Sequence, residues 1–111
     1  MTHDAINWLR EIHRLGTRIL EMVSSLDLAT YSSSEYPRIG VERYLISLGE
    51  AARAAMRQDP TLKERIPALI DANDLRNILT HAYLRIDDRV VWNAVTVELP
   101  RLLDRIEREI G

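Results

Sequence analysis

Apolar residues return at alternating intervals of three and four positions through most of this chain, which is the spacing of an α-helix with one buried side. Three long stretches carry this pattern: residues 4–26, 36–57 and 88–110. No stretch alternates apolar and polar residues as a half-exposed strand would. The sequence therefore predicts an all-α fold. The apolar positions of the first stretch are Ala5, Trp8, Ile12, Leu15, Ile19, Met22 and Leu26.

A fourth long helix is predicted from about Ala68 to Ala82, after two breaks in the pattern. Residues 58–61 and the pair Ile66-Pro67 punctuate the chain, and a short helical turn fits between them. We predict an up-and-down bundle of four long helices plus this short helical turn, folded as a single domain over residues 1–111. The inward positions of the second and last long helices are Val41, Leu45, Leu48, Ala52 and Ala55, and Val91, Val95, Leu99, Leu102, Ile106 and Ile110.

Local residue types add further expectations. The serine-rich residues 24–34 predict a loop, and residues 84–88 predict an extended connection. Gly16 lies inside the first helix, where close approach of a neighbouring helix would explain it. Pro100 should kink the last helix, and Trp92 should pack in the core.

Composition excludes several classes of protein. Among 111 residues there is no cysteine, and therefore no disulfide frame or thiolate metal site. No apolar run is long enough to span a membrane, and the N-terminus lacks the layout of a signal peptide, so we expect a cytoplasmic protein. A net charge of −2 does not indicate a broad nucleic-acid surface. Lys63 is the only lysine; the arginine excess reflects either genomic base composition or phosphate recognition.

Residues 75–84, within the fourth helix and just beyond it, concentrate the chemically capable side chains. At about 100° per residue, one face of a helix carries Leu75, Ile78, Leu79 and Ala82, and the opposite face carries Asn73, Arg76, Asn77, Thr80 and His81. Asn77 and His81 are one turn apart and can touch. Solvated faces usually consist of Glu, Lys and Gln, whereas these types bind anions or move protons. The pattern predicts a functional site; the alternative is a buried polar network that fastens the helix to its neighbours.

Arg76-Asn77, His81 and Tyr83 resemble the R-N-x-x-x-H-x-Y signature of HepT-like toxins, which are HEPN-domain partners of minimal nucleotidyltransferase (MNT) antitoxins. Three further segments are similar to family motifs. Residues 48–52 resemble I-G-E-A-A, and Ile66-Pro67 resembles the start of I-P-W, with Ala68 replacing the tryptophan. Residues 91–92 and 99–102 resemble V-W and L-P-x-L. The resemblance covers residues 27–106.

The resemblance implies a metal-independent endoribonuclease that acts as a two-fold homodimer on RNA and needs no cofactor. The residue types fit this chemistry. His81 can act as base or acid, because histidine titrates near neutral pH, and Arg76 can bind two phosphate oxygens at once. Asn77 could orient the imidazole or contact phosphate, with Thr80 in support. Glu50 is either a surface carboxylate or a partner that orients Arg76 or His81 from the facing helix.

The resemblance further implies that Tyr83 accepts AMP groups from the MNT-type antitoxin, which would neutralise the toxin. Bulky negative charge beside Arg76 would then repel RNA. The chain itself lacks the Gly-Ser pair and paired carboxylates of a nucleotidyltransferase, so it should receive nucleotide rather than transfer it. The alternative function is a non-catalytic helical module that binds a nucleotidyltransferase. A motif histidine and arginine buried away from any cleft would favour that alternative.

Overall fold

The fold is described from a computed structural model of the chain, which covers residues 1–81 and 86–111. Every regular element in this part is helical, so the all-α prediction is confirmed. The elements are α1 (His3–Val23), α2 (Leu28–Ser33), α3 (Glu35–Gln58), α4 (Leu62–Arg65), α5 (Ala68–His81), α6 (Asp88–Asn93), the π-helical segment η1 (Ala94–Glu98) and α7 (Leu99–Ile110).

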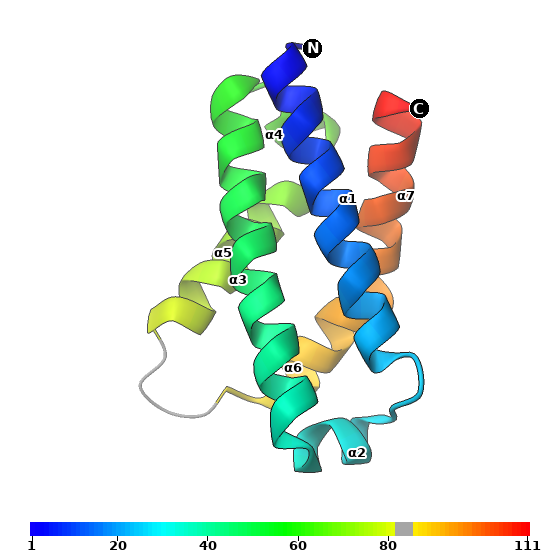
Figure 1. The fold of residues 1–111 in the computed structure, drawn as a ribbon. Coiled ribbons are helices and arrows are strands. Elements are labelled where there is room, and N and C mark those ends of the chain that lie inside the picture. Colours follow the sequence, from blue (N-terminus) through cyan, green and yellow to red (C-terminus); the bar gives the residue numbers. More distant parts are fainter. Residues whose placement is uncertain (82–85) are drawn as a thin grey trace.

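The helices form a bundle with α3 between α1 and α5. Figure 1 shows α1 and α3 running side by side, with α5 crossing behind α3 and α7 to the right of α1 and partly behind it. The two termini lie at the same end of the molecule. The C-terminal end of α5 projects past the side of α3, so the predicted motif helix leaves the body of the bundle as it ends (Figure 1). None of the helices in the described part is long and apolar enough to cross a membrane.

The predicted apolar positions of α3 are all buried, as are those of the last stretch except the half-buried Ile110. In α1 the prediction was wrong for Trp8, which is 39% exposed, while the adjacent Leu9 is fully buried. Two neighbouring positions satisfy the three-and-four spacing equally well, and the helices that α1 contacts decide between them. The side of α1 that packs also includes Gly16, where an added Cβ would lie 2.7 Å from Leu103 Cδ2 of α7. The expected close approach is confirmed.

Residues 24–34 contain a helix where a loop was predicted. The side chain of Asp27 caps α2 by accepting a hydrogen bond from the Thr30 amide at 2.8 Å. Tyr31 is then buried, and its ring lies 5.3 Å from that of Trp92 between centroids. Because six residues give too short a window for periodicity, serine content dominated the prediction. Trp92 is partly buried against the core through this contact.

The predicted helix at residues 88–110 is divided by a widened π turn immediately before Leu99-Pro100. Proline at position 100 cannot donate a hydrogen bond to the carbonyl of Thr96, and its ring crowds that carbonyl. A widened turn relieves this crowding. The α6 and α7 segments run in different directions (Figure 1), so the last helix bends near Pro100, as expected from its sequence.

Candidate active site

Gly49 sets the distance between α3 and α5 and thereby positions Arg76. A Cβ at Gly49 would lie 2.3 Å from Arg76 Cβ and 2.7 Å from the carbonyl oxygen of Ala72. Both distances are far below van der Waals contact, so a side chain at residue 49 would push the helices apart. The backbone of α3 therefore supports the base of the Arg76 side chain. This contact explains a glycine in the middle of a long helix.

The guanidinium of Arg76 is held between the two helices. Its Nη1 donates to Asn77 Oδ1 at 3.0 Å, and its Nη2 lies 3.7 Å from Glu50 Oε1. The Arg76 side chain is 23% exposed, whereas that of Glu50 is 54% exposed. An ion pair this open to water contributes little stability, but it limits the directions that the guanidinium can take. The buried Nε of Arg76 has no hydrogen-bond partner in the described part of the chain.

Asn77 and Thr80 support Arg76 and its helix. Asn77 accepts from Arg76, and no described hydrogen bond joins it to His81, which the one-turn spacing would have allowed. The Thr80 hydroxyl donates to the carbonyl oxygens of Arg76 and Asn77, at 3.0 and 3.3 Å. Of the predicted site residues, the structure therefore brings Glu50, Arg76 and Asn77 together, with Thr80 bonded to the backbone beneath them.

His81 is the last residue of α5 and is exposed. No hydrogen bond or ion pair joins His81 to another described residue. It is five positions after Arg76, which corresponds to about 140° around a helix and about 7.5 Å along it. The two predicted catalytic side chains therefore leave α5 in different directions. Tyr83, the predicted AMPylation residue, lies outside the described residues.

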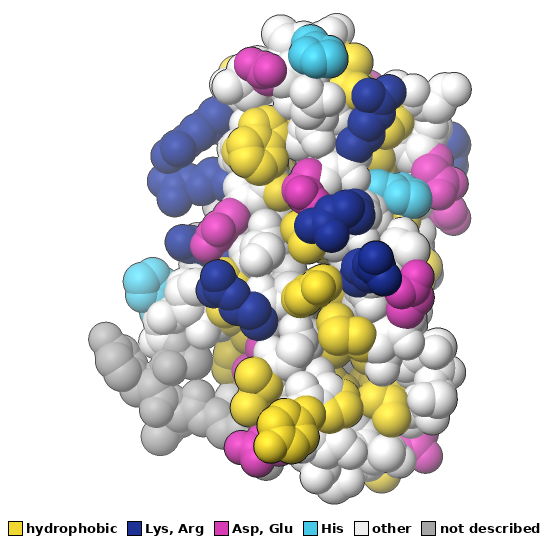
Figure 2. Space-filling view, viewed as in Figure 1, with side chains coloured by type: hydrophobic (Ala, Val, Ile, Leu, Met, Phe, Trp, Pro, Cys, Tyr) yellow, Lys and Arg dark blue, Asp and Glu magenta, His cyan; other side chains and the backbone are white. Residues whose placement is uncertain are grey.

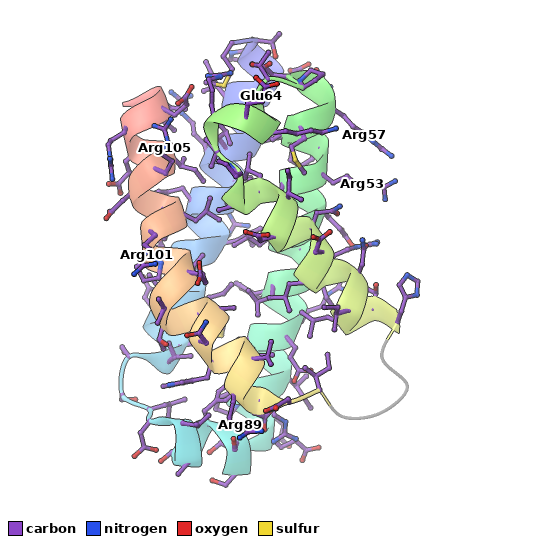
Figure 3. The ribbon with its side chains drawn as sticks, turned by 180° about the vertical axis from the view of Figure 1, so that it is seen from behind. Arg53, Arg57, Glu64, Arg89, Arg101 and Arg105 are labelled. Atoms are coloured by element: carbon purple, nitrogen blue, oxygen red, sulfur yellow. The ribbon has the colours of Figure 1, made fainter. Side chains whose placement is uncertain are left out.

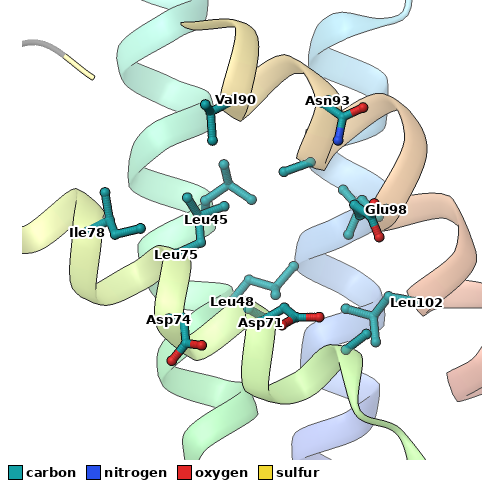
Figure 4. A pocket seen from close by; sticks show the side chains of 14 residues that line it. Leu45, Leu48, Asp71, Asp74, Leu75, Ile78, Val90, Asn93, Glu98 and Leu102 are labelled. Atoms are coloured by element: carbon teal, nitrogen blue, oxygen red, sulfur yellow. The ribbon is translucent and has the colours of Figure 1, made fainter. Parts of the chain in front are cut away.

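The face of α5 that packs differs from the predicted apolar face. Leu75 and Leu79 pack against the core, but Ile78 is 54% exposed, so its predicted place on the packed face was wrong. The reason is Gly49, which admits the stem of Arg76 to the contact with α3 and turns Ile78 toward solvent. Ile78 and the 53% exposed Val90 border an apolar hollow of 290 Å³ between α5 and the last helical stretch (Figure 4).

A second hollow, of 370 Å³, is bordered by Arg76 and lies between α1, α3 and α5. Its wall is formed by Trp8, Glu50, Arg53, Ala54, Arg57, Gln58 and Arg76. Sequence reasoning missed Arg53 and Arg57, although their i, i+4 spacing after Glu50 places all three on one side of α3. The residues of the signature predicted a site on α5, whereas these two arginines lie on the neighbouring helix α3.

Carboxylates with a lowered pKa lie away from this site, where helices begin. Hydrogen bonds from the Thr30 amide, the Thr61 hydroxyl and the Arg89 side chain lower the pKa values of Asp27, Asp59 and Asp87, respectively. These charges stabilise local turns rather than perform chemistry. Across the described residues, no group of three or more His, Asp or Glu side chains is arranged to hold a metal ion.

Comparison with known proteins places the chain in a family. Residues 12–109 match the family described as Ribonuclease HepT-like. The chain therefore belongs to this family, and the resemblance seen in the motif residues is confirmed. It is also similar to the protein named "Putative RNase MJ1380" of Methanocaldococcus jannaschii, with 26% identity over 106 residues and 94% of each chain covered. No solved structure matches the chain.

Proposed function

We propose that this protein is the HepT-like toxin of a HEPN/MNT toxin–antitoxin system and cuts RNA without a metal ion. Family membership supports the ribonuclease class. The observation that carries the proposal is the arrangement on α5: an arginine held between Glu50 and Asn77, and an exposed histidine at the end of the same helix. Together they supply a phosphate-binding cation and a proton-transfer group.

The reaction needs three contributions. A base removes the proton from a ribose 2′-OH, whose oxygen attacks the adjacent phosphorus; the bond to the 5′-oxygen breaks, and an acid protonates that oxygen. His81 is assigned proton transfer, which contributes about 10²–10⁴-fold in typical enzymes. Arg76 is assigned the negative charge that grows on the non-bridging oxygens. Glu50 and Asn77 hold the guanidinium in place for that role.

A homodimer would complete the site. Arg76 and His81 of one chain point about 140° apart. A second copy packed against α5 would supply the missing acid or base. Asp74, Ile78 and His81 follow one another at i, i+4 and i+7 and share a solvent-facing side of α5. An isoleucine 54% exposed in the middle of that side supports a contact there.

Neutralisation is assigned to AMPylation of Tyr83 by an MNT-type nucleotidyltransferase. Tyr83 follows His81 by two residues in the sequence. Each added AMP group brings a negatively charged phosphodiester next to the residues that would bind RNA phosphate. Repulsion and bulk would then block substrate.

A non-catalytic module that binds a nucleotidyltransferase is the second candidate. The observation in its favour is that Arg76 is only 23% exposed and is already paired with Glu50 and Asn77. The exposure of His81, and the hollow bordered by Arg76, favour catalysis instead.

Growth of a bacterial host tests the toxin–antitoxin assignment. Wild type, His81→Ala and the exposed-histidine control His3→Ala are expressed with and without the minimal nucleotidyltransferase of the same genome. We expect wild type and His3→Ala to stop growth unless the antitoxin is present, and His81→Ala to be harmless throughout. Tyr83→Phe should stay toxic beside the antitoxin. Equal, harmless growth of wild type and His81→Ala would instead support the non-catalytic module.

A further inference from the structure

The hollow bordered by Trp8, Arg53, Arg57 and Arg76 carries charge that the fold does not use. Arg53 and Arg57 are exposed, lie one turn apart on α3, and form no ion pair or hydrogen bond with any described residue. Elsewhere, arginines such as Arg14, Arg65 and Arg89 pair with nearby carboxylates. Like charges at i, i+4 disfavour a helix slightly. Arg101 and Arg108 of α7 also lack such partners among the described residues. Arg53 and Arg57 differ because they border one hollow together with Arg76, and this shared position points to a ligand.

The sign and position of the charge indicate an anion. The hollow contains three arginines against one carboxylate, Glu50, in a chain whose net charge is −2. Figure 2 shows Lys and Arg side chains gathered along the side of the molecule formed by the C-terminal half of α3. Figure 3 shows Arg53 and Arg57 extending from this side, with Arg101 and Arg105 on the opposite side of the bundle.

Trp8 adds an aromatic surface to the hollow. It is 39% exposed, although its neighbour Leu9 is fully buried in the same helix. A tryptophan beside unpaired arginines is the combination with which proteins bind single-stranded nucleic acid: the cations contact phosphates, and the ring stacks on a base. Apolar docking of a protein segment would not need three arginines.

Arg76 connects this hollow to the candidate catalytic residues. Its side chain borders the hollow and also contacts Glu50 and Asn77. We propose that the hollow between α1, α3 and α5 is a binding subsite for the single-stranded RNA next to the cleaved bond. Arg53 and Arg57 contact its phosphates, and Trp8 stacks on one of its bases. The assignment rests on the proposed ribonuclease function and names the path by which substrate reaches Arg76.

RNA binding can be measured separately from cleavage. The full-length His81→Ala protein is titrated into a 5′-fluorescein-labelled single-stranded RNA of mixed sequence, and fluorescence anisotropy is followed at several salt concentrations. In this background, Arg53→Ala/Arg57→Ala is compared with Arg101→Ala/Arg108→Ala, which removes the same charge from exposed positions of α7. Circular dichroism and thermal unfolding check that each variant is folded.

We expect the Arg53/Arg57 variant to bind about ten-fold more weakly. The slope of log affinity against log salt concentration (the salt slope) should become shallower by roughly 1.4, because two phosphate contacts are lost. The Arg101/Arg108 control should stay near the parent. Trp8→Ala should weaken binding about ten-fold with little change in salt slope. Equal affinity and salt slope in the two arginine variants would overturn the subsite, as would no binding by the parent.

Cleavage with His81 intact separates the two proposals. The Arg53→Ala/Arg57→Ala enzyme should show a raised KM with kcat retained, because the subsite holds substrate and does not react. Cleavage that depends on His81 but has an unchanged KM in this variant would overturn the subsite and leave the ribonuclease intact. If wild type binds RNA through the two arginines but does not cleave it, the ribonuclease proposal is overturned and RNA binding in the hollow is retained.

Discussion

At the scale of single residues, the arrangement around Arg76 accounts for both its position and its proposed role. Gly49 lets the stem of Arg76 reach the backbone of α3. Glu50 contacts its Nη2 atom, and Asn77 accepts a hydrogen bond from its Nη1 atom. Since these contacts use the fork shape of the guanidinium, a lysine in its place would keep the charge and lose the geometry.

Arg76→Lys should therefore reduce kcat for RNA cleavage by about 100-fold, the typical effect of losing a charge-stabilising donor. Circular dichroism should show the helicity of wild type. Arg101→Lys, at an exposed position of α7, is the matched control and should keep full activity. An Arg76→Lys enzyme as active as that control would exclude a two-pronged phosphate contact.

The residue types at this site could be predicted from the sequence, but their directions could not. Helical spacing placed Arg76, Asn77 and His81 on one broad polar side of α5 and allowed Asn77 to touch His81, whereas the described contact of Asn77 is with Arg76. Helical spacing alone could not show that Arg76 packs against α3 while Ile78 faces solvent, because that arrangement depends on Gly49 of another helix. Arg53 and Arg57 were missed because they lie on α3 rather than on the motif helix, and only the packing of the two helices places them around one hollow with Arg76.

At the scale of the elements, the crossing of α3 and α5 is the contact on which the site depends. The long helices could be predicted, because each carries its own apolar period. Which of Trp8 and Leu9 faces the core, and whether the short segment α2 forms, are decided by neighbouring helices. Local sequence contains no information about those neighbours.

Two glycines of α3 allow a matched test of this crossing. A Cβ at Gly49 would overlap Arg76 Cβ and the Ala72 carbonyl, whereas a Cβ at Gly40 would meet only Met22 Sδ at 3.5 Å. Gly49→Ala should lower the free energy of unfolding by about 1–3 kcal/mol and reduce cleavage. Gly40→Ala should raise it by up to about 1 kcal/mol through helix propensity. Urea denaturation measures both; equal effects would mean that the helices are not in close contact at Gly49.

At the scale of the whole molecule, one chain presents a single motif histidine beside an exposed apolar surface. The hollow between α5 and the last helical stretch has Ile78 and Val90 at its edge (Figure 4). By helical spacing, His81 lies one turn beyond Ile78 on a similar side of α5. A second copy that covers this side would bury the apolar residues and bring two histidines toward a shared cleft.

Ile78→Asp tests this assembly, with Ile39→Asp as its control, since both isoleucines are 54% exposed. Sedimentation velocity should show wild type and Ile39→Asp as dimers and Ile78→Asp as a monomer, because a charge would be buried in the contact. RNA cleavage should fall with the dimer. A monomeric Ile78→Asp protein that cleaves normally would show that one chain suffices.

The most direct test of the central claim is cleavage of a defined RNA by the purified protein in the presence of EDTA. We predict that wild type and His3→Ala leave a 2′,3′-cyclic phosphate on the upstream fragment, at rates unchanged by the chelator, and that His81→Ala is slower by about 10²–10⁴-fold. Mass spectrometry of the fragments identifies the ends. Cleavage by His81→Ala at the wild-type rate, or cleavage by wild type that stops when metal is removed, would contradict the mechanism.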